Sequence, residues 1–229
     1  MPTLVLDRIV AHRDGHPALV DVSLTLPAAR VTALVGDNGS GKSTMLEVLA
    51  GVLAHDGAID GLPERRALVV QRTDLAERLP MTARAAVAMG LWRERGPLRR
   101  LTRDDRARVD AALDVVGMRA LASRQLAALS GGQRQRVLVA QGLVQDAPLT
   151  LLDEPTASAD AASRDRIDAA MRALAERGST VIVATHDRAS LARADHAVLL
   201  ERGRVVAEGV PEEVAAEQVR RAAAALALP

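Results

Sequence analysis

The fold is decided by the stretch Gly36-Asp37-Asn38-Gly39-Ser40-Gly41-Lys42-Ser43, which fits the phosphate-loop pattern G-x-x-x-x-G-K-[ST]. The apolar run Val31–Val35 precedes it, and a helix is expected to follow over Lys42–Ala50. In this strand, loop and helix context, glycines let backbone N–H groups surround a phosphate, and the helix contributes its positive end. The sequence therefore predicts a nucleotide site in which Lys42 reaches the terminal phosphates and Ser43 can hold Mg²⁺.

Apolar runs alternate with helical patterns along most of the remaining chain. Buried strands are expected at Ala67–Val70, Leu149–Leu152 and Thr180–Ala184, and helices at Gln133–Val144 and Ser163–Arg177. Strands that alternate with helices usually pair in parallel, because each helix carries the chain back to the same edge of the sheet. The predicted fold class is therefore α/β with a mainly parallel sheet.

Two β-rich segments near the N-terminus predict a separate antiparallel sheet. Thr3–Ala11 and Ala18–Leu26 are joined by the polar, Gly- and Pro-containing segment His12–Pro17, which is expected to form a hairpin loop. A second hairpin is expected at Ala197–Leu200 and Val205–Glu208. The chain is thus predicted to carry an antiparallel β subdomain beside its parallel sheet.

The segment Arg72–Ala128 differs from the regions on either side of it. It has no clear strand pattern and is rich in Ala, Arg, Leu and Asp, with helical spacing over Asp104–Val116. We therefore expect residues 72–128, extending to about 145, to form a helical lobe inserted into one domain that spans residues 1–229. Val210–Pro229 is expected to form a short C-terminal helical tail.

Composition excludes several classes of function. The 229 residues include 30 Lys+Arg and 29 Asp+Glu, a net charge of +1 that argues against nucleic acid as a partner. With no cysteine, the chain cannot form a disulfide, a thiolate metal site or a cysteine nucleophile. No apolar run reaches the ~18 residues of a spanning helix, so a location in the cytoplasm is expected.

Two adjacent carboxylates follow one of the predicted buried strands, in Leu149-Thr150-Leu151-Leu152-Asp153-Glu154. At the carboxyl edge of an open parallel sheet they would lie beside the phosphate loop. There Asp153 can hold Mg²⁺ through water, and Glu154 can orient or deprotonate the water that attacks a γ-phosphate. A pair that merely caps a following helix is the alternative for these two residues alone.

A second helix start suited to anions occurs at Leu129-Ser130-Gly131-Gly132-Gln133. Together with the phosphate loop, Asp153-Glu154 and Thr185-His186-Asp187, this stretch resembles the signature of ABC ATPases, which belong to the P-loop NTPases. The order of the motifs is similar to that family across nearly the whole chain. The resemblance implies an ATP-hydrolysing subunit that uses ATP and Mg²⁺.

The resemblance also implies how the site is completed. Two copies would pair head to tail as a homodimer, so that Ser130, Gly131, Gly132 and Gln133 of one copy close over the γ-phosphate held by Gly36–Thr44 of the other. It further assigns Gln71 to sensing the γ-phosphate and Mg²⁺, and His186 to contacting the γ-phosphate. Taken alone, Gln71 would be unremarkable, and His186 would be a polar residue at a strand end.

Two positions depart from the family pattern. The segment Glu154–Asp160 resembles the loop through which the subunits touch, but Ala159 stands where leucine is usual. About two dozen residues before the phosphate loop the family places an aromatic ring that stacks on adenine, and this chain has Asp14 there. The planar side chains of the neighbours His12, Arg13 and His16 could stack on the base in its place. The alternative is that these residues belong to a solvated loop. We hypothesise weak discrimination between nucleotide bases.

The predicted lobe carries a second resemblance, to ATPases of zinc and manganese importers, over Leu79–Gly90 and Arg99–Arg106. It implies a subunit peripheral on the inner face of the cell membrane, bound to a transmembrane permease near Gln71 and Arg72–Trp92. An extracytoplasmic solute-binding protein would belong to the same system. The alternatives are the ATPase of another importer or of an exporter, and a non-transport ABC ATPase.

Overall fold

The computed structural model describes residues 2–70, 80–97, 99–157 and 159–226. The predicted site residue Gln71 lies outside these described ranges. Among the described residues, no helix has both the length and the apolar character that crossing a membrane requires.

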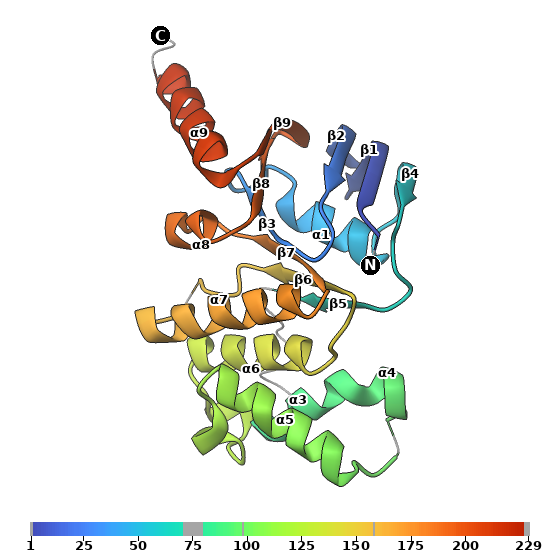
Figure 1. The fold of residues 1–229 in the computed structure, drawn as a ribbon, viewed down its shortest axis with the longest axis vertical. Coiled ribbons are helices and arrows are strands. Elements are labelled where there is room, and N and C mark those ends of the chain that lie inside the picture. Colours follow the sequence, from blue (N-terminus) through green and yellow to red (C-terminus); the bar gives the residue numbers. More distant parts are fainter. Residues whose placement is uncertain (1, 71–79, 98, 158, 227–229) are drawn as a thin grey trace.

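A six-stranded sheet forms the centre of the molecule (Figure 1). Its strand order is β5-β6-β7-β3-β8-β9, and every neighbouring pair is parallel except β8 and β9. The strands are β3 (Val31–Val35), β5 (Arg66–Val69), β6 (Leu149–Asp153), β7 (Thr180–Ala184), β8 (His196–Glu201) and β9 (Arg204–Gly209). All residues of β3 and β7 are buried, as expected for parallel strands covered on both faces. The mainly parallel sheet is confirmed.

A separate antiparallel sheet has the strand order β2-β1-β4. It contains β1 (Leu4–Arg13), β2 (His16–Leu26) and β4 (Asp56–Asp60). The predicted hairpin is confirmed, but its loop is shorter than residues 12–17, because both strands extend into that segment and leave a turn of only Asp14 and Gly15. These two residues have φ of 51° and 79°, the left-handed pair that a two-residue hairpin turn requires. The short, exposed β4 was not predicted.

Helices cover the sheet and build the lobe. Outside the lobe, the described residues form the helices α1 (Lys42–Ala50), α7 (Ala161–Glu176), α8 (Arg188–Ala192) and α9 (Pro211–Leu226). Between β5 and β6 lie α3 (Ala83–Ala88), α4 (Trp92–Arg95), α5 (Arg103–Val115) and α6 (Gly131–Leu143), with short 3₁₀ turns at Met89–Leu91, Arg119–Leu121 and Leu126–Ala128. Figure 1 shows α3, α4 and α5 at the end of the molecule opposite β1, β2 and β4. These helices fall within the segment for which the sequence predicts an inserted helical lobe.

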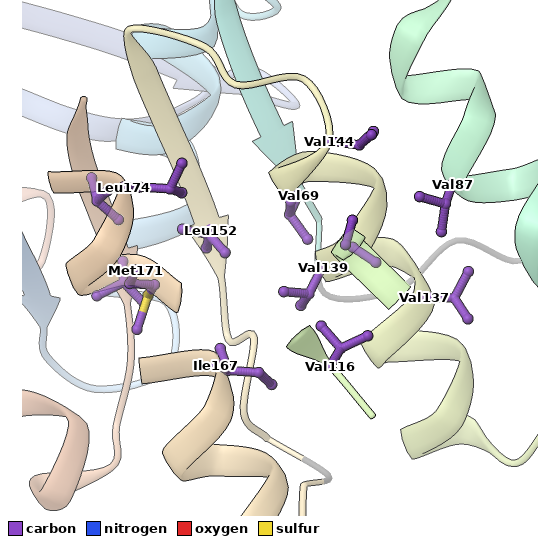
Figure 2. Packing of buried hydrophobic residues seen from close by; sticks show 14 of the residues in the cluster. Val69, Val87, Val116, Val137, Val139, Val144, Leu152, Ile167, Met171 and Leu174 are labelled. Carbon is purple, nitrogen blue, oxygen red and sulfur yellow. The ribbon is translucent and has the colours of Figure 1, made fainter. Parts of the chain in front are cut away.

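The lobe and one face of the sheet share a hydrophobic core (Figure 2). In this cluster Val69 and Leu152 of the sheet pack with Val139 of α6 and Ile167 of α7. A Cβ at Gly142 of α6 would overlap Cγ2 of Val69, so glycine lets the helix approach the sheet closely. Helix α6, which begins at the predicted second anion site, therefore packs closely against the sheet.

Candidate active site

The phosphate loop connects β3 to α1. Its glycines are needed for two reasons, a positive φ angle and a close approach to neighbouring backbone atoms. At Gly36, φ is 142°, and a Cβ there would overlap the backbone oxygen of Leu200. At Gly41, φ is 109°, and a Cβ would lie 2.8 Å from the backbone oxygen of Ala18. Gly39 has φ of 79° with open space around it, so at this position glycine serves backbone conformation. Such a loop leaves room for a phosphate against the backbone.

Lys42 holds this loop together from the first position of α1. Its buried Nζ donates hydrogen bonds to the backbone oxygens of Gly36, at 2.7 Å, and Asp37, at 2.9 Å. Burial lowers the pKa of Lys42, while the negative charges of Glu154, Asp153 and Asp37 act against this shift. The ammonium group is thus a preformed cationic donor at the point where terminal phosphates are expected.

A cleft of about 410 Å³ opens beside the loop. It is lined by Arg13, Ala18, Asn38, Gly39, Gly41, Lys42, Ser43, Thr44, Asp153, Glu154 and His186. The cleft therefore unites the phosphate loop with three polar residues from the ends of β6 and β7. These residues meet because Asp153 pairs with Ala184 in parallel register, which brings the carboxyl ends of both strands to one edge.

Asp153 lies at the end of β6 and lines the cleft together with Ser43. Burial raises the pKa of Asp153, whereas the hydroxyl group of Ser43 and the positive charge of Lys42 act to lower it. A hydroxyl oxygen beside a carboxylate is the type of hard oxygen donor set that Mg²⁺ prefers. These two side chains therefore fit the metal that the sequence predicts.

Glu154 is buried next to the mouth of the cleft, with a backbone in the left-handed region at φ 50°. Its N–H donates to the backbone oxygen of Ala184 at 3.0 Å, which ties it to the end of β7. Its Oε1 atom lies 2.8 Å from Nδ1 of His186. Strained backbone of this kind occurs often at active sites, where the surrounding fold enforces it.

The predicted second anion site, Ser130–Gln133, lies at the start of α6. Ser130 caps α6, and its hydroxyl accepts from the Gln133 N–H at 3.3 Å while the Gln133 side chain accepts from the Ser130 N–H at 3.0 Å. Ser130 and Gly131 are exposed, and a Cβ at Gly131 would meet no atom within 4 Å. Among the residues described, none of Ser130 to Gln133 lines the cleft. The structure thus separates the predicted second anion site from the phosphate loop of the same chain.

The wall of the cleft also contains one partner of an ion pair that the sequence did not predict. Arg13, at the end of β1, lines the cleft, and its guanidinium forms an ion pair with the carboxylate of Glu47 on α1. Within the described part of the chain, neither His12 nor His16 is among the lining residues. The sequence pattern that could have located Arg13 is Asp14-Gly15, a dipeptide typical of two-residue turns, because such a turn places Arg13 at the end of a strand.

The family model for ABC transporters matches residues 19–157, which include the phosphate loop, the serine and glycines that start α6, and both carboxylates of the cleft. The chain belongs to the ABC transporter family. It is an ABC ATPase that binds nucleotide.

Curated relatives of this ABC ATPase come from several metal-related systems. It is 39% identical to the zinc transport system ATP-binding protein TroB of Treponema pallidum, over 94% of this chain and 84% of that protein. It is 37% identical to the hemin import ATP-binding protein HmuV of Rhodococcus jostii, over 95% of this chain and 78% of that protein. It is 35% identical to the manganese transport system ATP-binding protein MntB of Bacillus subtilis, over 91% of this chain and 87% of that protein.

Solved structures agree with the fold of this ABC ATPase. The cbiO1 protein of Clostridium perfringens, part of the ABC transporter complex cbiONQ, is 29% identical with a TM-score of 0.75, over 95% of this chain and 92% of that one. A dimeric ATP-binding cassette in a post-hydrolysis state, bound to ADP and phosphate, has a TM-score of 0.78 at 24% identity, over 91% and 98%. The predicted ABC cassette architecture is thus confirmed.

Proposed function

We propose that this ABC ATPase powers the import of a divalent metal ion, zinc or manganese, through a separate permease in the cell membrane. The observation that carries the enzymatic part is the cleft, where Lys42, Asp153 and Glu154 meet around the phosphate loop. The direction of transport rests on the relative that is named for hemin import, and the cargo rests on the two relatives that are named for zinc and manganese transport.

Binding of ATP is assigned to the loop from Gly36 to Thr44. Its backbone N–H groups and the start of α1 would surround the phosphates, and Lys42 would exchange its two backbone acceptors for phosphate oxygens. Ser43 and Asp153 would hold Mg²⁺, which neutralises charge on the phosphates when bound. The predicted contribution of Gln71 at the metal and γ-phosphate is part of this proposal.

Hydrolysis is assigned to Glu154 as the base. The carboxylate accepts a proton from the attacking water, the water oxygen bonds to the γ-phosphorus, and the bond to the bridging oxygen of ADP breaks. His186, already beside Glu154, would donate a hydrogen bond to the γ-phosphate. The products are ADP and inorganic phosphate.

A second copy of the chain is required to complete the site. Ser130, Gly131, Gly132 and Gln133 are placed at the exposed start of α6, where N–H groups lack partners within the helix. In a head-to-tail homodimer these groups would cover the γ-phosphate on the loop of the other chain. ATP would then close the dimer, and hydrolysis would open it again.

Transport requires partners that the chain itself does not supply. The inserted lobe, taken as residues 72–128 and extending to about 145, would bind the permease near Arg72–Trp92 on the cytoplasmic face of the membrane. Closure of the ATPase dimer would move the lobes and switch the side to which the permease opens. An extracytoplasmic solute-binding protein would deliver the cargo.

The two-chain site is tested with Glu154→Gln, which should bind ATP without splitting it and accumulate as a dimer detectable by light scattering. Adding Gly131→Asp should abolish that dimer, because the new carboxylate would face the γ-phosphate of the other chain. The isolated chain has space for this side chain. A dimer that persists in the double variant would contradict the assignment.

The cargo is tested in cells that lack the chromosomal copy of this gene. Deletion should lower cellular zinc or manganese under metal limitation, and the wild-type gene but not Glu154→Gln should restore it. Because one relative is named for hemin import, the same cells are grown with haemin as the iron source. A defect confined to haemin would replace the metal-ion assignment with a haem one.

A further inference from the structure

An ion pair next to the cleft joins two segments that flank the active site. Nε of Arg164, in the first turn of α7, lies 3.3 Å from Oδ2 of Asp187. Asp187 directly follows His186 in the chain. The two side chains are about a third and a quarter exposed, so this pair is less open to solvent than a typical surface ion pair.

Asp187 is held in place by the connection between β7 and α8. Its N–H donates to Oγ1 of Thr185 at 3.0 Å, and its Oδ1 accepts from the N–H of Ala189 at 3.1 Å as the N-cap of α8. Oδ2 accepts a hydrogen bond from the hydroxyl group of Ser190 at 3.3 Å, and within the described residues it pairs with Nε of Arg164 through charge alone, without a hydrogen bond. A displacement of this carboxylate would therefore disturb the first turn of α8, which directly follows His186 and Asp187 in the chain.

Arg164 reaches in the opposite direction as well. Its terminal guanidinium nitrogen donates to the backbone oxygen of Ala159 at 3.4 Å. Ala159 precedes Asp160, the N-cap of α7, whose carboxylate accepts from the N–H of Ser163 at 2.7 Å. One guanidinium thus connects the loop after Glu154 with the segment that carries His186.

We propose that Arg164 is a positioning residue for His186. By holding Asp187 it sets where the imidazole stands relative to Glu154, and through Ala159 it couples that position to the loop that resembles the family's subunit contact. The inference rests on the proposed role of His186 at the γ-phosphate. Contact by a second chain at the loop would in this way reach the hydrolytic residues without touching them.

The kinetic test combines Arg164→Ala and Arg164→Lys with His186→Ala in a double-mutant cycle. Arg164→Ala should lower kcat for ATP hydrolysis about 5- to 30-fold with little change in KM, on the scale of energies measured between contacting residues. Arg164→Lys should recover part of the loss, and Arg164→Ala should cause no further loss in the His186→Ala protein. Equal losses in both backgrounds would mean a merely structural role.

A second measurement does not depend on activity. The imidazole NMR signal of His186, assigned by its absence in His186→Ala, should shift in Arg164→Ala protein without nucleotide and stay in place in the control Arg172→Ala. Arg172 lies on the same helix, where its side chain pairs with Asp195. An unshifted His186 signal in Arg164→Ala would overturn the inference.

The two assays separate this inference from the proposed function. Full ATPase activity in His186→Ala would remove the role of His186 and with it the purpose of its positioning. Loss of activity in His186→Ala, combined with wild-type kcat in a folded Arg164→Ala protein, would leave the proposed function intact and overturn only the role of Arg164.

Discussion

Nδ1 of His186 lies 2.8 Å from Oε1 of Glu154, at the adjoining ends of β7 and β6. The carboxylate is 10% exposed, whereas the imidazole is 67% exposed. The buried group therefore has its partner on the open side of the site, where a phosphate would arrive. The ring can turn toward a ligand while the fold keeps the carboxylate in place.

Glu154→Gln should reduce kcat for ATP hydrolysis by about 10²- to 10⁴-fold, the usual contribution of a general base. Nucleotide affinity should change little, because the amide keeps the size of the side chain and Lys42 is untouched. Single-turnover hydrolysis and calorimetric titration with ATP measure the two effects. Glu176→Gln, at the exposed end of α7, is the matched control, and wild-type hydrolysis in Glu154→Gln would contradict the base role.

Lys42 is the single lysine of the chain, so lysine labelled with ¹⁵N and ¹³C gives one side-chain signal. Because burial lowers its pKa, the amine should lose its proton at lower pH than an exposed lysine. ATP should raise the pKa of Lys42, since phosphate favours the charged form. Identical titration curves with and without ATP would disprove contact between Lys42 and the phosphates.

Lys42→Ala should weaken ATP binding by about 10- to 100-fold, the range expected when hydrogen bonds from a charged group are lost. The loop also loses the two bonds to Gly36 and Asp37 that hold it in the absence of ligand. Calorimetry with ATP measures the loss, and Arg177→Ala, on the exposed end of α7, serves as a control. Unchanged affinity would show that the backbone alone binds the phosphates.

Asp153→Asn should raise the melting temperature of the protein and lower its rate of ATP hydrolysis. Burial raises the pKa of Asp153 in the folded protein above that of the unfolded chain, so its favourable contribution exists at acid pH and is lost as the pH rises through the folded-state pKa. The variant should melt at a higher temperature than wild type near neutral pH, and the difference should shrink in acid. Hydrolysis should fall at least about 100-fold, because a predicted Mg²⁺ ligand is removed.

Melting curves at several pH values in metal-free buffer without nucleotide test this expectation. A Tm of Asp153→Asn below that of wild type at every pH would mean that the favourable interactions of the carboxylate with Ser43 and Lys42 outweigh the cost of burying its charge. The activity loss is measured separately at saturating ATP.

Discrimination between nucleotide bases should be weak, because Arg13 lines the cleft without a Trp, Phe or Tyr beside it among the described lining residues, and the chain contains one Trp, no Phe and no Tyr. We expect comparable affinities for ATP, GTP and CTP. Arg13→Tyr should raise ATP affinity by about 5- to 100-fold if a ring at this position stacks on the base. A strong preference of the wild-type protein for ATP would refute the hypothesis.

The local motifs needed only the sequence. The phosphate loop, the strand ending in Asp153 and the helix start at Ser130 are short patterns whose spacing alone determines local backbone structure. Apolar runs of strand length likewise predicted most of the parallel sheet, because strands covered on both faces have no polar side. The weak points were exposed elements such as β4, which has few apolar residues to identify it.

Relationships between distant residues were decided by the tertiary structure. The pairs Glu154 with His186, Arg13 with Glu47, and Arg164 with Asp187 join residues 32, 34 and 23 positions apart, and each depends on strand register and helix packing. Helix packing also separates Ser130 from the cleft, because α6 packs against β5 through Gly142 and Val69. The sequence determined which groups are present, and the packing of sheet and helices decided which of them meet, since a residue pattern specifies local conformation but not the distance between distant elements.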